Sequence, residues 1–306
     1  MPIKTPSTAF SAFSRTFLFV LRLPFFLAYV ATYFVALQYL PLPTVVRKLL
    51  LWFMMGIPGI WWVDLQLDGV KRGSLSQQPP SRVPHPGSVI AANHTSPVDA
   101  IYLSAIFDPI FTVSYPHSRK VRRVSLLRAV IHAVSPAQFG PPPNTGLTDL
   151  RALLRAHPDR VIAVFPECGT TNGRGILPFS PSLLSTPAKT KIFPVSMRYT
   201  PPDITTPIPG AWFAFLWKLL SRPTHCIHVR IAEGTENTTG VLHRVEEASG
   251  RDSGYDDGDE EDGRDVAPGE QQVLDWVADA LARLGRNKRV GLTLRDKKAF
   301  TKAWKG

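Results

Sequence analysis

Residues Ser88–Asp99 read SVIAANHTSPVD, a run of small and branched apolar residues followed by polar ones. The apolar part, SVIAA, has the length and composition of a strand that is buried on both faces. Ser96 and Pro97 together form a helix-start signal, because Ser caps free backbone N–H groups and Pro fits the first helical turn. The stretch therefore predicts a buried strand, a short polar turn that carries His94, and a helix over 98–107.

Three apolar runs further along the chain have the same strand-like character. They are Arg160–Phe165 (RVIAVF), Lys191–Met197 (KIFPVSM) and Ile227–Ile231 (IHVRI). Helical patterns cover 147–156 and 271–284, where apolar residues recur on one face. Because strands that alternate with helices favour parallel pairing, the sequence predicts an α/β fold with a mainly parallel sheet flanked by helices.

The N-terminal region contains two long uncharged runs. Leu23–Val46 (LPFFLAYVATYFVALQYLPLPTVV) has 24 residues without a charge, and about 20 apolar residues suffice to cross a bilayer. The second run, Leu49–Val63, is 15 residues long and includes three Trp, which suits an interfacial segment better than a span. We therefore expect a membrane-anchoring helical region over 1–70. A fully buried core hairpin and a secretory signal peptide are the alternatives.

Charge is distributed unevenly along the chain. The net charge is +11, but 246–270 holds 11 acidic and two basic residues, so the rest carries +20. This strongly basic remainder of the chain favours an anionic partner, and the apolar N-terminal region indicates membrane lipids. Nucleic acid is disfavoured, because the basic cluster RKVRR at 119–123 lacks interleaved aromatic residues. We interpret this cluster either as a solvated face or as a contact site for anionic headgroups or for the phosphates of CoA.

The composition also suggests boundaries within the chain. We expect an α/β core over 71–245, a disordered acidic loop over 246–270, and a C-terminal helix and tail over 271–306 that complete the core. A regulatory or partner-binding role is the alternative for the acidic loop.

Two polar residues flank the predicted helix start. His94 follows the buried strand, and Asp99 lies in the first helical turn. The Asp99 carboxylate can hold one ring nitrogen of His94, which fixes the imidazole tautomer and raises the basicity of the other nitrogen, as a general base requires. A simple capping turn is the alternative interpretation.

A second polar loop, Phe165–Gly175 (FPECGTTNGRG), follows another predicted strand. Ligands of open α/β sheets bind beyond the carboxyl ends of the strands, so we expect this loop and His94 to face one crevice. Backbone N–H groups, hydroxyl groups and the Arg174 guanidinium could bind a phosphorylated group there. A structural turn that needs glycine is the alternative.

These motifs resemble those of the glycerolipid acyltransferases, which include the 1-acylglycerol-3-phosphate acyltransferases. Asn93–Asp99 (NHTSPVD) is similar to the N-H-x4-D block of that family, and Phe165–Gly175 is similar to its F-P-E-G-T block in the variant that continues T-T-N-G. Lys191–Tyr199 resembles a later apolar block. The long form FPECGTTNGRGILPF and the closing segment Asp296–Trp304 (DKKAFTKAW) are most similar to fungal lysophosphatidic acid:oleoyl-CoA acyltransferases.

The resemblance implies an acyl-CoA-dependent O-acyltransferase that acylates a lysophospholipid. The leading acceptor is 1-acylglycerol-3-phosphate, and its acylation gives phosphatidic acid. Another acceptor of the lysophosphatidylcholine type, a thioesterase or lipase activity, and a non-catalytic membrane adaptor are the alternatives. Acyl-CoA would be a co-substrate, with no bound cofactor and no metal. The endoplasmic reticulum membrane, together with lipid droplets, is the implied location.

The resemblance also implies roles for particular residues. His94, oriented by Asp99, would take the proton from the acceptor hydroxyl. The residues that would bind the substrate are Asn93, Glu167, Gly169, Thr170, Thr171, Asn172, Gly173 and Arg174.

The chain departs from the family pattern in the second block. Cys168 stands where the family usually has Gly, Gly169 where it has Thr, and Thr170 where its commonest form has Arg. Arg174 is therefore our candidate for the charge that binds an acceptor phosphate. Two weaker hypotheses are a Cys168 nucleophile and a metal site at His225–His228, whose two histidines a strand would place on opposite faces.

Overall fold

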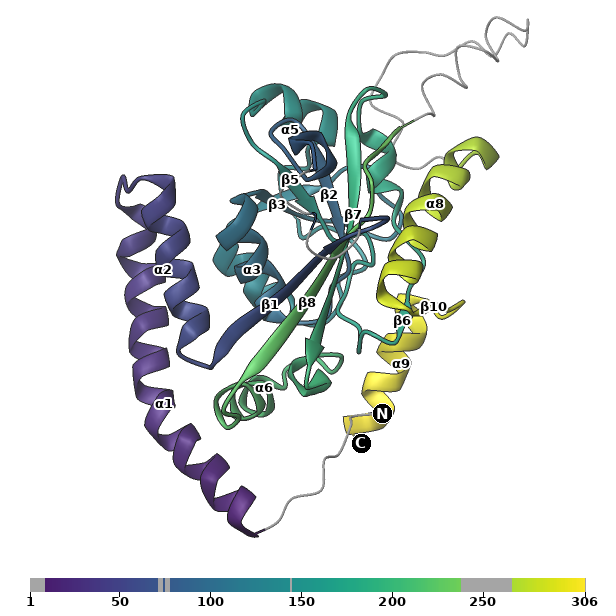
Figure 1. Ribbon diagram of the computed structural model, residues 1–306. Helices are drawn as coiled ribbons and strands as arrows, with labels where there is room; N and C mark the ends of the chain where they lie inside the picture. The colour runs from purple at the N-terminus through teal and green to yellow at the C-terminus, as the bar shows by residue number, and fades with distance from the viewer. Residues whose placement is uncertain (1–8, 71–73, 75–77, 144, 238–265, 306) are drawn as a thin grey trace, which may run out of the picture.

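The computed structural model describes residues 9–70, 74, 78–143, 145–237 and 266–305. A twisted sheet forms its centre, with helices on both sides and a helical hairpin at one flank (Figure 1). The predicted α/β fold with a mostly parallel sheet is confirmed. Most of the acidic segment 246–270 lies outside the described residues, which resume at Val266.

The central sheet has the strand order β1-β8-β7-β2-β5-β3-β4, with β9 paired to β7. The strands are β1 (Ile60–Leu67), β2 (Val89–Ala92), β3 (Ile110–Val113), β4 (Arg122–Val124), β5 (Ile162–Val164), β7 (Lys191–Thr200), β8 (His225–Ile231) and β9 (Thr235–Glu236). The inner strands β7, β2, β5 and β3 run parallel, as do β1 and β8, whereas β4, β8 and β9 pair antiparallel to their neighbours β3 and β7. Every residue of β2, β3 and β5 is buried, which explains their continuous apolar sequences.

The helices on the two faces of the sheet follow the apolar patterns of the sequence. They are α3 (Pro97–Phe107), α4 (Leu126–His132), α5 (Leu150–Ala156), α6 (Trp212–Leu220), α8 (Pro268–Gly285) and α9 (Leu294–Lys305). α5 begins later than predicted, because Thr148 exchanges two backbone hydrogen bonds of 2.9 Å with Val121. α8 ends at Gly285 as expected, and its apolar face packs in a second core cluster.

A short two-stranded sheet places the C-terminal part of the chain beside the rest. It consists of β6 (Gly175–Ile176) and β10 (Lys288–Arg289), which pair in parallel. Because β6 directly follows the loop that begins at Phe165, this pairing brings the start of α9 close to that loop.

The N-terminal apolar run forms a hairpin rather than one helix over 23–46. Helix α1 spans Ala9–Val35 and α2 spans Thr44–Gly56, so the uncharged run is divided between two helices. Pro41 and Pro43 lie between the two helices and cannot donate helical hydrogen bonds, which accounts for the break. By length and composition, residues 12–39 could cross a membrane.

The second uncharged run is divided between α2 and the edge strand β1. The chain reverses at Gly59, where φ is +89° and a Cβ atom would lie 2.3 Å from the carbonyl oxygen of Pro223. Only glycine fits so close an approach, and the strand that follows carries Trp61 and Trp62, both more than 60% exposed. The sheet therefore extends into the region that we expected to be helical.

The hairpin is attached to the sheet domain but is not a buried core hairpin. The Arg22 guanidinium of α1 donates hydrogen bonds to the carbonyl oxygens of Pro58, Arg222 and Pro223, at 3.2, 2.6 and 3.2 Å. Large apolar side chains remain exposed on α1, α2, β1 and α6, and we call them the exposed apolar set: Phe13, Phe17, Val20, Phe25, Phe53, Trp61, Trp62 and Phe213. Exposed apolar surface of this kind marks contact with a membrane or another protein.

Candidate active site

The end of β2 is fixed to β7 through the side chain of Asn93. Its amide nitrogen donates to the carbonyl oxygen of Met197 at 2.9 Å, and its amide oxygen accepts from the Met197 backbone N–H at 2.7 Å. Helix α3 begins after Ser96, whose hydroxyl oxygen accepts from the Val98 backbone N–H at 3.3 Å, as the capping signal predicted. The turn that carries His94 is therefore held at both ends.

His94 is 1% exposed and lies between two other rings. Its imidazole packs against the ring of Phe165, with centroids 4.3 Å apart, and lies parallel to His132 at 6.2 Å. Among the described residues, neither ring nitrogen of His94 has a hydrogen-bond partner. Burial holds the His94 pKa well below its usual value, and the nearby charges of His132 and Lys297 add to this effect. The imidazole is thus neutral near pH 7, and one of its two buried ring nitrogens carries an unprotonated lone pair.

Asp99 does not make the expected contact with His94. Within the described part of the chain, its carboxylate accepts instead from the backbone N–H groups of Thr95 and Ser96, at 2.6 and 2.8 Å, and from the hydroxyl group of Tyr199. The reason is the capping geometry, because a carboxylate in the first helical turn reaches back to the free N–H groups of that turn. Burial raises the Asp99 pKa to about 6 despite these bonds. Asp99 therefore positions His94 through the backbone of the turn.

The second polar loop lies against the His94 turn, as the sheet topology predicted. The Thr171 backbone N–H donates to the carbonyl oxygen of His94 at 2.8 Å, and the His94 backbone N–H donates to a carboxyl oxygen of Glu167 at 3.4 Å. Gly173 has φ of +68°, and a Cβ atom there would lie 3.6 Å from the methyl group of Thr95. The carboxyl ends of β2 and β5 thus bring both motifs into one site.

Glu167 is a buried residue of this loop, and its carboxyl group contacts two backbone N–H groups. It is 1% exposed, and its second carboxyl oxygen accepts from the Leu177 backbone N–H at 3.2 Å. Burial raises the Glu167 pKa to about 8, although these hydrogen bonds and the charge of Lys297 oppose the rise. Glu167 therefore joins the two ends of the loop and is largely protonated at neutral pH.

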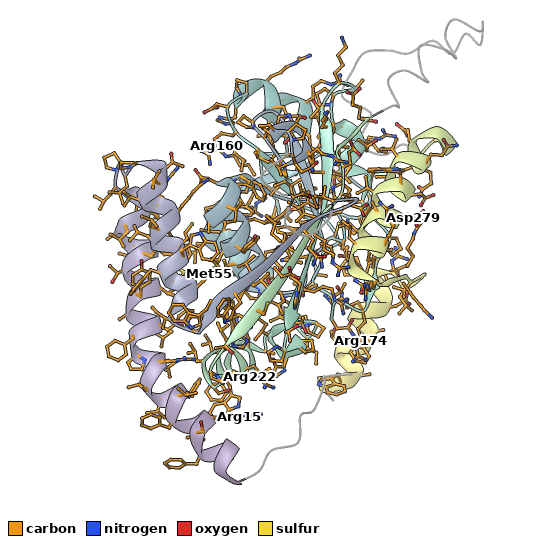
Figure 2. All side chains as sticks on the ribbon, in the orientation of Figure 1. Arg15, Met55, Arg160, Arg174, Arg222 and Asp279 are labelled. Atoms are coloured by element: carbon orange, nitrogen blue, oxygen red, sulfur yellow. The ribbon has the colours of Figure 1, made fainter. Side chains whose placement is uncertain are left out.

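The other loop residues differ in their contacts and in their exposure. The Thr170 hydroxyl group donates to the carbonyl oxygen of Thr206 at 2.7 Å, and the Asn172 side chain accepts from the Arg174 backbone N–H at 3.1 Å. The side chain of Arg174 is exposed (Figure 2). Gly169 lies against α9, where a Cβ atom would be 3.2 Å from a methyl group of Leu294.

Two ionisable residues of this site were not predicted from the sequence. The Lys297 ammonium group of α9 donates a hydrogen bond to the carbonyl oxygen of Thr170, and burial lowers its pKa to about 8. His132, the last residue of α4, is a neighbour of His94, and burial lowers its pKa to about 4. The one signal for Lys297 was its place in the closing segment, which resembles the same family but contains no recognised site motif.

The hypotheses built on other residues are not favoured by the geometry. Burial raises the pKa of the Cys168 thiol to about 12, so it is not ionised at neutral pH. Cys168 also adopts φ of +55°, which explains why glycine suits this position. His225 is buried and contacts the Leu219 carbonyl oxygen, whereas His228 pairs with Asp64.

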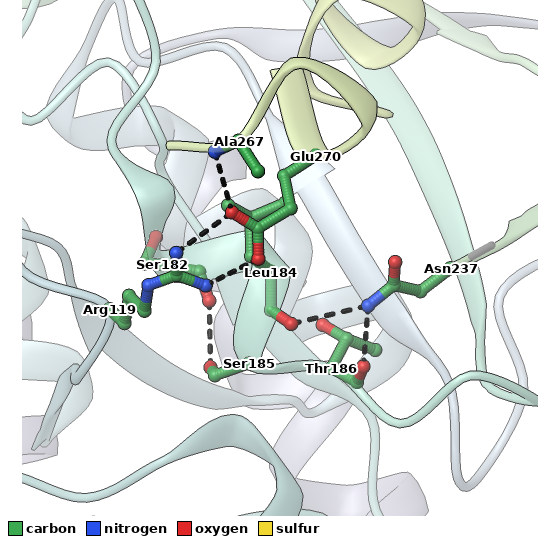
Figure 3. A network of polar contacts seen from close by, with 8 residues as sticks. All are labelled: Arg119, Ser182, Leu184, Ser185, Thr186, Asn237, Ala267 and Glu270. Atoms are coloured by element: carbon green, nitrogen blue, oxygen red, sulfur yellow. Dashed lines mark hydrogen bonds and ion pairs between the residues drawn. The ribbon is translucent and has the colours of Figure 1, made fainter. Parts of the chain in front are cut away.

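A metal site is likewise absent from the part of the chain that the structure describes, where no three His, Cys, Asp or Glu side chains are grouped to hold an ion. Arg119, the first residue of the basic cluster at 119–123, makes a structural contact. Arg119 forms two hydrogen bonds with the carboxylate of Glu270, at 2.7 and 2.8 Å, and Glu270 also accepts from the Ala267 backbone N–H (Figure 3). This ion pair fixes the start of α8.

Comparison with known proteins agrees with the site. Residues 76–198 match the family described as Acyltransferase, and this segment contains both polar motifs. The resemblance to acyltransferases that the motifs predicted is confirmed over this segment. It is 32% identical over 130 residues to a Schizosaccharomyces pombe protein assigned as a lysophosphatidic acid:oleoyl-CoA acyltransferase. That alignment covers 41% of this chain and 42% of its relative, so less than half of either protein is compared.

Proposed function

We propose that this protein transfers a fatty acyl group from acyl-CoA to a hydroxyl group of a lysophospholipid. The proposed acceptor is 1-acylglycerol-3-phosphate, and the product is then phosphatidic acid. The observation that carries the proposal is the imidazole of His94, which is neutral, has no partner for its ring nitrogens among the described residues, and faces the polar loop of an acyltransferase-family segment. The name of the fission-yeast relative supports the choice of acceptor.

The chemistry needs one group that accepts and returns a proton. A ring nitrogen of His94 takes the proton of the acceptor hydroxyl while the oxygen bonds to the thioester carbonyl carbon. The carbon–sulfur bond then breaks, and the leaving CoA sulfur takes the proton back from the imidazolium. The two substrates supply all atoms of the products, and Asp99 keeps the His94 turn in place.

An apolar cavity beside the loop supports a lipid substrate. It has a volume of about 430 Å³ and is lined by Cys168, Leu177, Phe139 and Leu294, among others. Ligand pockets generally have volumes of roughly 300–1,000 Å³ and mainly apolar walls. We propose that this cavity receives a fatty acyl chain.

Membrane association is part of the same proposal. The apolar residues 12–39 and the exposed apolar set together supply surface that a bilayer can cover. Placement at the endoplasmic reticulum membrane and at lipid droplets rests on the family resemblance alone.

Acceptor-dependent release of CoA tests the proposal. The purified protein in phospholipid vesicles is incubated with oleoyl-CoA, with and without 1-acylglycerol-3-phosphate, while free thiol and acylated lipid are measured. Release of CoA only in the presence of this acceptor, with phosphatidic acid formed in equal amount, is the expected result. Release without an acceptor would identify a thioesterase instead. Transfer only to lysophosphatidylcholine would correct the acceptor, and no turnover with any lysolipid would favour the adaptor alternative.

A further inference from the structure

Lys297 brings a positive charge into the active site from the C-terminal helix α9. Its ammonium group donates to the carbonyl oxygen of Thr170, which is its one hydrogen-bond acceptor among the described residues. An ammonium group has three N–H donors, so two remain for another partner. The proton transfer by His94 makes no use of this charge.

Glu167 is an acidic group within electrostatic reach of Lys297 and raises its pKa, in opposition to burial. The charge of Lys297 lowers the pKa of both His94 and His132, which places it within electrostatic reach of these two rings. Both rings are already neutral at pH 7, and the pKa of nearby Glu167 is raised to about 8. A partly buried cation without a full counter-charge is costly to maintain unless a ligand supplies the negative charge.

Among the described residues, buried ring nitrogens without hydrogen-bond partners occur on the two histidines near Lys297. The ring nitrogens of His94 and Nε2 of His132 are buried and have no hydrogen-bond partner in the described part of the protein. Such atoms are rare in protein interiors, and both rings lie within electrostatic reach of the Lys297 ammonium group. An acceptor-rich ligand would accept from the N–H donors of these rings and from the two remaining donors of Lys297.

The loop is shaped to let Lys297 approach. A Cβ atom on Gly169 would lie only 3.3 Å from Nζ of Lys297, so a side chain at this position would crowd the ammonium group. The loop residues 165–173 contain no Lys or Arg of their own. The first base after them, Arg174, has an exposed side chain.

We propose that Lys297 binds the phosphate group of the acyl acceptor beside His94 and thereby selects acceptors that carry a phosphate monoester. A phosphate monoester brings nearly two negative charges and three acceptor oxygens, which match an ammonium group with free donors. The proposal rests on the proposed function, since it names the residue that recognises the acceptor. CoA also carries phosphate groups, and the experiment separates these two sources.

The kinetic test compares three variants. Lys297→Gln removes the charge but keeps a donor for Thr170, Lys297→Arg keeps the charge, and Lys302→Met removes an exposed charge from the same helix. Each is assayed with 1-acylglycerol-3-phosphate and with monoacylglycerol, which lacks the phosphate, at varied oleoyl-CoA. We expect K297Q to raise KM for the phosphorylated acceptor by roughly 10- to 100-fold. Its KM for oleoyl-CoA and its kcat with monoacylglycerol should change far less than this. K297R should recover most of the lost affinity because it keeps the charge, and K302M should keep all constants within about threefold of the parent.

Other kinetic outcomes would overturn the proposal. A rise in KM for oleoyl-CoA alone would assign the phosphate to CoA. An equal fall in kcat with both acceptors would show that Lys297 only supports the fold of the site.

A binding test without turnover separates this proposal from the proposed function. Glycerol 3-phosphate should raise the thermal unfolding midpoint of the parent protein and of K302M, but not that of K297Q. If the parent transfers no acyl group yet shows this Lys297-dependent shift, the proposed function fails and the phosphate site stands. If glycerol 3-phosphate stabilises K297Q as much as the parent, or stabilises neither, the phosphate site is refuted.

Discussion

Asp99 at the start of α3 accepts a hydrogen bond from the hydroxyl group of Tyr199 on β7, 100 residues further along the chain. The same carboxylate holds the backbone N–H groups of Thr95 and Ser96. One buried side chain therefore connects the strand end, the His94 turn and the helix start. The position of His94 depends on this connection, because the imidazole itself has no hydrogen-bond partner among the described residues.

Loss of the Tyr199 hydroxyl group should destabilise the protein. Tyr199→Phe removes a donor from a buried carboxylate, and a hydrogen bond to a charged group contributes about 1.5–3 kcal/mol. Urea unfolding in detergent should show a decrease of this size in the free energy of unfolding. Tyr115→Phe is the matched control, because the Tyr115 hydroxyl is buried with no partner in the described residues and its removal should cost nothing. Equal losses in both variants would contradict the connection described above.

Removal of the Cys168 thiol should leave acyl transfer largely intact. With a pKa raised to about 12, the thiol supplies almost no thiolate at pH 7. We expect Cys168→Ala to retain kcat within about threefold, because alanine fills most of the same buried space without the sulfur. A loss as large as that caused by replacing His94 would reinstate a covalent acyl-cysteine intermediate.

The affinity for a phosphorylated acceptor should fall at alkaline pH. The pKa of Lys297 is about 8, so its ammonium charge is present below this pH and is lost above it. We expect KM for 1-acylglycerol-3-phosphate to rise as the pH increases through 8 in the parent protein. The rise should disappear in Lys297→Arg, because a guanidinium group stays charged at these pH values. If the rise persists in that variant, the titrating group is Glu167, whose pKa is also raised to about 8.

Charges introduced into the exposed apolar set should weaken membrane binding. Phe17→Asp on α1 and Phe213→Asp on α6 place a carboxylate on side chains that are 59% and 71% exposed. Flotation with phospholipid vesicles should recover less of either variant than of the parent. Trp276→Asp is the control, because Trp276 is 41% exposed on α8, on the other side of the sheet (Figure 1). Equal flotation of all variants would mean that these helices do not contact lipid.

Local sequence was sufficient to predict the four strands β2, β5, β7 and β8 and the meeting of the two motifs. The strand before His94 and the strand before Glu167 are short apolar runs, and parallel neighbours end at the same edge. Ser96 and Pro97 predicted the start of α3 because capping depends only on adjacent residues. Both inferences needed no knowledge of distant contacts.

The partners of the site could not be predicted, because they come from remote parts of the chain. Nothing near Asp99 indicates that its carboxylate would meet Tyr199. Lys297 follows Thr170 by 127 positions and reaches it only because α9 lies against the loop at Gly169. The break between α1 and α2 does have a local signal, because Pro41 and Pro43 follow the end of α1 at Val35.

The role of His94 is tested most directly by its replacement with a neutral residue of similar size. In His94→Gln, formation of phosphatidic acid from oleoyl-CoA and 1-acylglycerol-3-phosphate should fall by about 10²- to 10⁴-fold, the usual contribution of a general base. Vesicle flotation and the unfolding midpoint should remain those of the parent, because the exposed apolar set and the Asp99 contacts are unchanged. Turnover comparable to that of the parent protein would contradict the proposed mechanism.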